Sequence, residues 1–110
     1  HQAEERLRGS VNSLRQGILA SKGKKRVIGN LLRDWYGSQR AIFRTLLRLK
    51  KFKGEISEGL EETLCREYEL QPGAIIALQK YHEQGDGNPL LLAEEMLLFM
   101  RELVLKVDSL

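Results

Sequence analysis

Apolar residues recur every three or four positions along this 110-residue chain, and they never alternate with polar residues for long enough to indicate a β-strand. The first stripe has steps of four, three and four, which places its members on one side of a helix over residues 4–21. Its members are Leu7, Val11, Leu14 and Ile18. The pattern as a whole predicts an all-α chain that folds as a compact bundle of five or six helices.

Residues that favour helix ends divide the basic first half of the chain. A lysine-rich loop at residues 21–25, with Gly23 inside it, separates the first helix from a second that ends at Trp35. Gly37–Ser38 is typical of a stop followed by a new N-cap, which predicts a third helix over residues 39–52. The alternative is one kinked helix that covers both segments.

The second half carries similar boundary signals. Ser57 is expected to cap a fourth helix, with glutamates in its first turn where the helix dipole favours anions. These glutamates are Glu58, Glu61 and Glu62. Pro72 suits the first position of a fifth helix that ends at Gly85, and Asn88–Pro89 predicts the start of a last helix to about Val107. That last helix is apolar on most sides, which predicts a central, buried position.

Charge is distributed unevenly between the two halves. Residues 1–54 hold 14 Lys and Arg against 3 Asp and Glu, whereas residues 55–110 hold 4 against 12. The formal net charge of +3 therefore conceals a basic half joined to an acidic half. Such asymmetry bears on association and on the choice of partner rather than on the fold.

One basic stripe on the expected third helix is the main candidate for a binding site. Arg40, Arg44, Arg48 and Lys51 follow one another at steps of four, four and three, and Arg33 is assigned to the same site. Like charges one turn apart repel by about 0.2–0.5 kcal/mol per pair. An anion bound beside the stripe would offset this repulsion. We interpret it as the contact for an acidic segment of a partner protein. The alternative is that it pairs with the chain's own glutamates.

A secondary basic cluster lies in the loop before the second helix. Its members are Lys22, Lys24, Lys25 and Arg26. Backbone N–H groups at a helix start, with lysines beside them, are suited to a phosphate, but the glycine spacing does not match a nucleotide-binding P-loop. An ordinary solvated loop is the other interpretation.

Nucleic-acid binding through the same stripe is the alternative function, because phosphate contacts need only positive charges. Bases are usually stacked on exposed aromatic side chains. Trp35, Phe43 and Phe52 fall at core-facing spacing, and only Tyr36 is expected to point outward. Sequence-specific readout of bases is therefore not indicated.

Catalytic and metal-binding signatures are weak. His1, His82 and Cys65 do not have the spacing of metal ligands, and Cys65 beside Leu64 is expected to be a core thiol. Glu61–Glu62 and Glu94–Glu95 are typical of charges in a helix first turn rather than of an acid/base pair. We therefore expect no enzyme, no cofactor and no metal.

Together these patterns predict a non-catalytic scaffold or adaptor module. We expect one helical domain over residues 1–110, and the His at position 1 suggests a fragment of a larger intracellular protein. No apolar run approaches the roughly 20 residues that span a bilayer. Self-association between basic and acidic faces is a third possibility, besides an acidic protein partner and nucleic acid.

Overall fold

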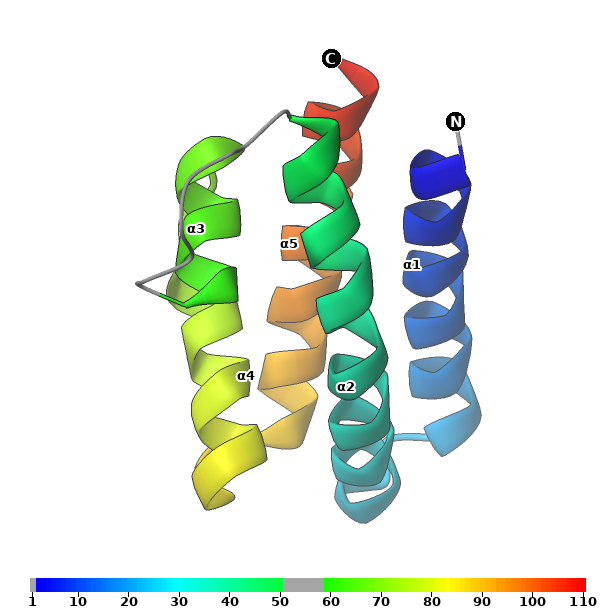
Figure 1. Ribbon diagram of the computed structural model, residues 1–110. Coiled ribbons are helices and arrows are strands. Elements are labelled where there is room, and N and C mark those ends of the chain that lie inside the picture. Colours follow the sequence, from blue (N-terminus) through cyan, green and yellow to red (C-terminus); the bar gives the residue numbers. More distant parts are fainter. Residues whose placement is uncertain (1, 51–58) are drawn as a thin grey trace.

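The computed structural model describes residues 2–50 and 59–110, and in these residues it contains five helices and no strand (Figure 1). The helices are α1 (Gln2–Ser21), α2 (Lys25–Leu49), α3 (Leu60–Glu67), α4 (Gly73–Gln84) and α5 (Pro89–Asp108). The predicted all-α bundle is confirmed. The Cα radius of gyration is 13.6 Å, close to the value of about 13 Å for a compact chain of this length.

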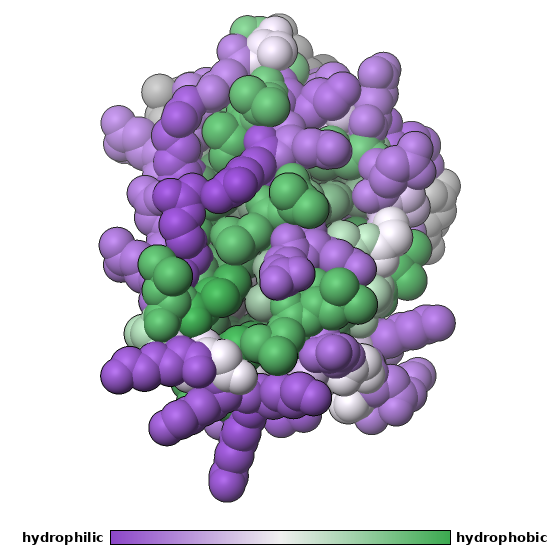
Figure 2. Space-filling model, turned by 180° about the vertical axis from the view of Figure 1, so that it is seen from behind, coloured by the Kyte–Doolittle hydropathy of each residue, from purple (hydrophilic) through white to green (hydrophobic). Residues whose placement is uncertain are grey.

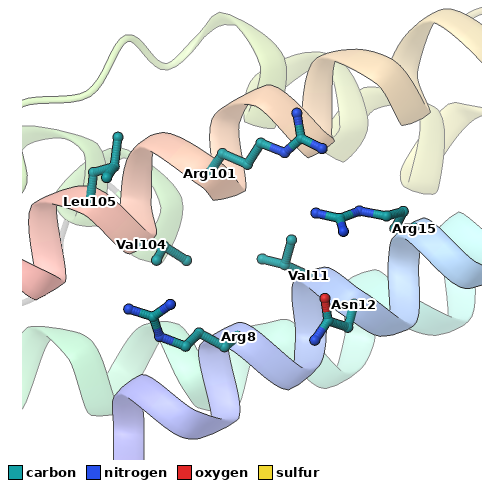
Figure 3. A pocket seen from close by; sticks show the side chains of 7 residues that line it. All are labelled: Arg8, Val11, Asn12, Arg15, Arg101, Val104 and Leu105. Carbon is teal, nitrogen blue, oxygen red and sulfur yellow. The ribbon is translucent and has the colours of Figure 1, made fainter.

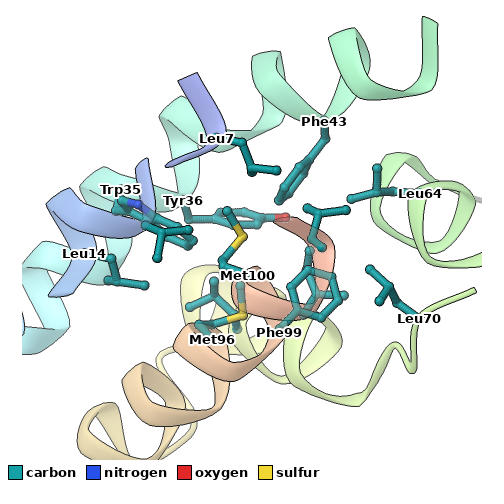
Figure 4. Packing of buried hydrophobic residues seen from close by; sticks show 14 of the residues in the cluster. Leu7, Leu14, Trp35, Tyr36, Phe43, Leu64, Leu70, Met96, Phe99 and Met100 are labelled. Atoms are coloured by element: carbon teal, nitrogen blue, oxygen red, sulfur yellow. The ribbon is translucent and has the colours of Figure 1, made fainter. Parts of the chain in front are cut away.

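Helices α2 and α5 are the two central elements of the bundle. α2 contacts all four other helices, and α5 contacts α1, α2 and α4. Leu7, Val11 and Leu14 of the predicted first stripe are buried here. α5 contributes Met96 and Met100, which lie in the core beside aromatic side chains of α2 (Figure 4). The buried apolar residues form a single cluster.

Local signals set the boundaries of the last two helices. The Asn88 side chain accepts a hydrogen bond from the Leu90 backbone N–H at 3.1 Å, and Pro89 occupies the first turn of α5. Gly85 ends α4 in the left-handed conformation, with φ of 74°, which suits glycine because it has no Cβ. These predicted boundaries are confirmed. Pro72 differs by one position, since it is the N-cap of α4 rather than its first residue.

The predicted helix break at Gly37–Ser38 is wrong, because α2 runs through it without interruption. A glycine inside a helix costs only about 1 kcal/mol relative to alanine. Trp35 and Gln39, on either side of the predicted break, both bond to Ser10 of α1. The indole N–H of Trp35 donates to the Ser10 carbonyl oxygen at 3.1 Å, and the Ser10 hydroxyl donates to the Gln39 side chain. These buried bonds hold both segments of α2 on one line against α1.

The N-cap of α3 is Gly59, and Ser57, which we expected there, lies outside the described residues. α5 is central but is not buried all round. Leu91, Leu98 and Leu105 are exposed, because α1, α2 and α4 cover three sides of the helix and no described residue covers the fourth.

Candidate interaction surface

The continuity of α2 joins the two predicted basic clusters. Arg26, which was expected in the loop cluster, lies in α2. Arg26, Arg33 and Arg40 follow one another at intervals of seven residues. Residues seven, four or three apart share one side of a helix. The basic flank of α2 therefore comprises five arginines and extends about 33 Å from first to last at 1.5 Å per residue. They are Arg26, Arg33, Arg40, Arg44 and Arg48. Lys51 lies outside the described residues.

Arg40, expected at the centre of the binding site, is bound internally. Its Nε lies 3.2 Å from Oε1 of Glu61 on α3, whose side chain is only 1% exposed, whereas that of Arg40 is 43% exposed. The alternative of pairing with the chain's own glutamates therefore holds at this position. Glu61 was expected as an ordinary first-turn charge, and its position in the first turn is confirmed, but its burial was not predicted.

Tyr36 is the second partner of Glu61. The expectation that Tyr36 points outward is wrong, because the ring is buried and its hydroxyl donates to Glu61 Oε1 at 2.6 Å. Burial, followed by the hydrogen bond to the carboxylate, raises the pKa of the Tyr36 hydroxyl above its usual range. On its outer side the ring contacts His82 of α4, with 5.0 Å between ring centroids. Glu61 thus links α2 to α3 by two polar contacts.

Arg33, Arg44 and Arg48 remain exposed along the flank. Arg33 lies over the Tyr81 ring of α4, 5.4 Å from its centroid, which orients the guanidinium without neutralising its charge. Among the described residues, neither Arg44 nor Arg48 forms an ion pair. Asp34 is the only acidic residue of α2. Within residues 2–50 and 59–110, the flank is therefore a row of positive charges of which only Arg40 is paired with a carboxylate.

The secondary basic cluster lies at the turn between α1 and α2. Lys22 adopts a positive φ of 52°, Lys24 is the N-cap of α2, and Lys25 begins the helix. No side chain caps this end and no acidic residue occupies its first turn. Positive charges at a helix start are repelled by the positive end of the helix dipole, so an external anion at this turn would relieve that repulsion.

Cys65 of α3 is a free cysteine with a buried side chain. Burial, together with the nearby Glu62 and Glu61 carboxylates, raises the pKa of the Cys65 thiol to about 11, so the thiol is protonated at neutral pH. No group of three or more potential metal ligands is present in residues 2–50 and 59–110. His1 lies outside this part of the chain.

Alkaline pH is expected to destabilise the fold, because burial raises the pKa of Tyr36, Cys65 and Tyr68. Burial raises the pKa of Tyr68, whose hydroxyl donates to the Leu46 carbonyl oxygen at 2.6 Å, to about 12 from an ordinary 10.0. The Cys65 pKa rises from 9.0 to about 11, and that of Tyr36 also rises. The folded state therefore holds more protons than the unfolded state above about pH 9, and the free energy of unfolding should fall as pH rises toward 12.

Urea titrations between pH 7 and pH 11 measure this effect. The double variant Tyr36→Phe/Tyr68→Phe, which has no phenol to ionise at either site, should lose less stability above pH 10 than the parent chain. Equal losses in the two proteins would show that these hydroxyls do not carry the effect.

The opposite side of the bundle has two hollows that sequence reasoning missed. One lies between α1 and α5, has a volume of about 370 Å³, and is lined by arginines over an apolar floor (Figure 3). Its lining includes Arg8, Arg15, Arg101, Val11, Val104 and Leu105. The other lies between α4 and α5 and includes Glu95, Leu98 and Glu102. The seven-residue spacing of Leu91, Leu98 and Leu105 was visible in the sequence, but only the packing shows that this side of α5 is open.

Comparisons with family models, with curated proteins and with solved structures find no match to this chain. None of the helices in the described part of the chain has the length and hydropathy needed to cross a bilayer.

Proposed function

We propose that this chain is a non-catalytic protein–protein interaction module that binds an acidic segment of a partner along the basic flank of α2. The observation that carries the proposal is the uninterrupted α2 helix, which aligns the exposed Arg26, Arg33, Arg44 and Arg48 on one flank. A partner carboxylate beside Arg44 and Arg48, which lie one turn apart, would relieve the repulsion between these two guanidinium groups. In this proposal the chain acts as a scaffold or adaptor.

Arg40 has a supporting part in this proposal. Its ion pair with Glu61 fixes α3 against α2 in the middle of the flank. Its charge is already compensated, so it contributes less to binding than Arg44 and Arg48 do. Arg44 and Arg48, which are exposed and lie one turn apart, are therefore the residues chosen to test partner binding.

A protein partner is favoured over nucleic acid by the position of the aromatic side chains. In the described residues, every tyrosine, phenylalanine and tryptophan is buried, including Trp35, Tyr36 and Phe43 beside the flank. The surface therefore offers charges but no exposed ring on which a base could stack. An acidic peptide needs only the charges and the spacing.

The double reversal Arg44→Glu/Arg48→Glu tests the proposal. We expect the affinity for a fluorescein-labelled Glu/Asp-rich peptide, measured by anisotropy at low ionic strength, to fall at least about tenfold, equivalent to about 1.4 kcal/mol. The melting temperature should change by no more than a few degrees, because both side chains are exposed. The matched control Arg6→Glu/Lys80→Glu makes the same change in net charge outside α2 and should bind like the parent chain.

Three results would contradict the proposal. Unchanged peptide binding would place the site elsewhere, and equal losses in the control would show an effect of net charge alone. A large loss of melting temperature would identify the flank as an internal electrostatic contact. If single-stranded DNA of matched length binds more tightly than the peptide, with a salt dependence that weakens in the double reversal, nucleic acid is the partner.

A further inference from the structure

We propose that the open side of α5 binds a second copy of this chain, so that two α5 helices lie parallel, side by side, about a two-fold axis. The basic hollow of each copy would then face the acidic hollow of the other. Three features favour this arrangement: an apolar line along α5, opposite charges on its two sides, and the symmetry that these charges permit.

The apolar line consists of Leu91, Leu98 and Leu105, seven residues apart. They are 53%, 63% and 66% exposed. Figure 2 shows hydrophobic side chains gathered over this side of the molecule, with hydrophilic side chains along its edges. Leucines at this spacing form a continuous seam when two helices pack at a small angle. Apolar surface of this kind, with polar residues around it, is typical of a protein interface.

Among the described residues, no acidic one lines the hollow on the α1 side of this line. Arg8 is paired with Asp108 at one end. Arg15 and Arg101 form no ion pair with any described residue, and their guanidinium groups both project over the apolar floor (Figure 3). Two guanidinium groups over an apolar floor repel each other more strongly than they would in bulk water. Carboxylates from outside would relieve this repulsion by charge-assisted hydrogen bonds.

The hollow on the α4 side supplies the complementary charge. Glu95 and Glu102 line it beside Leu98 and Phe99, and in the described part of the chain neither carboxylate forms an ion pair. Glu102 is adjacent in sequence to Arg101 but lines the hollow on the other side of α5. Glu94, also exposed on α5, lines neither of these two hollows. One face of the molecule thus presents a basic side, an apolar line and an acidic side.

Symmetry determines how two such faces fit. A two-fold axis along α5 sets the helices parallel and places the α1 side of one copy against the α4 side of the other. Arg15 and Arg101 then face the Glu95 and Glu102 side of the second copy at similar heights. An axis across α5 sets the helices antiparallel and opposes the two basic sides, which costs affinity. The charges therefore select the parallel arrangement.

Such a dimer leaves the proposed partner site open. α2 and the open side of α5 lie on opposite sides of the bundle (Figures 1 and 2). If the proposed function holds, a dimer presents two basic flanks, and a partner with two acidic segments gains affinity from the second contact. The dimer itself does not depend on that function, because its test contains no acidic partner.

Sedimentation equilibrium across a concentration series tests the dimer. We expect the mass to rise from 12.6 kDa toward twice that value with a dissociation constant in the range of about 1–100 μM, as for a small interface. Leu98→Glu should remain a monomer throughout the series. Val27→Glu, an exposed apolar position on α2, is the control and should associate like the parent chain. A parent chain that stays monomeric, or an unaffected Leu98→Glu, overturns the proposal.

Reversal of the charges on the two sides of α5 provides a second test of the dimer. A folding defect cannot explain association that is lost in each variant alone and restored when the two are mixed. Arg15→Glu/Arg101→Glu makes both sides acidic, and Glu95→Arg/Glu102→Arg makes both basic, so each variant alone should be a monomer. An equimolar mixture of the two should restore association, whereas a mixture that stays monomeric contradicts the charge pairing.

The parallel direction can be tested by cross-linking. Leu105→Cys, in a background of Cys65→Ser, should form a disulfide-linked dimer under mild copper–phenanthroline oxidation, because an axis along α5 brings the two copies of position 105 together. Leu19→Cys, exposed on α1, is the control and should cross-link far less. Cross-linking only between a Leu91→Cys chain and a Leu105→Cys chain would show an antiparallel pair and overturn the parallel arrangement.

Discussion

Replacing Leu103 by alanine is expected to lower the free energy of unfolding by about 2–5 kcal/mol. Leu103 lies on the side of α5 that faces the core and has no exposed surface. Its removal loses the transfer free energy of the missing atoms and leaves a cavity between the central helices, where packing relaxes only partly. Urea denaturation monitored by circular dichroism measures the change.

Leu105→Ala is the matched control for this prediction. It removes the same atoms from the same helix two residues later, but on the open side, so its effect should be within about 0.5 kcal/mol. The comparison is made at sub-micromolar concentration, below the dissociation constant expected for the proposed dimer. A loss below about 1 kcal/mol at Leu103, or similar losses at both positions, would contradict the packing of α5.

Replacing Glu61 by alanine is expected to cost about 2–4 kcal/mol. The substitution removes the acceptor of the buried Tyr36 hydroxyl and the counter-ion of Arg40. A buried donor without a partner accounts for about 1–3 kcal/mol, and the loss of the ion pair adds a smaller part because Arg40 is partly exposed to water. Thermal and urea denaturation measure the total.

Conservative variants separate these contributions. Glu61→Gln retains an oxygen acceptor for Tyr36 and should cost less than Glu61→Ala. Tyr36→Phe in the Glu61→Ala background removes the unpaired hydroxyl, so the double variant should be less destabilised than the sum of the single changes. If the single changes simply add, or if Glu61→Ala costs less than about 0.5 kcal/mol, the buried contact does not stabilise the junction of α2 and α3.

The helical class and several helix boundaries could be predicted from sequence because they depend on local chemistry. The spacing of Leu7, Val11 and Leu14 specifies one side of a helix whatever lies opposite it. The cap at Asn88 and the left-handed Gly85 act within one turn of the chain. The excess of arginine in α2 was likewise visible, since charge is a property of composition.

Only the tertiary structure decided how that helix is packed and which of its charges are paired. Gly37 is a plausible end of a helix, because glycine in a helix interior costs about 1 kcal/mol relative to alanine. Burial of Trp35 and Phe43 on one continuous face of α2 outweighs this cost, since each large apolar side chain contributes about 1.5–3 kcal/mol when it is buried. Spacing could not show that Glu61, 21 residues after Arg40, would be buried against it. Nor could the apolar pattern of α5 show which side lacks a neighbour. These features depend on which helices meet, and contacts between distant segments leave no periodic signal in the chain.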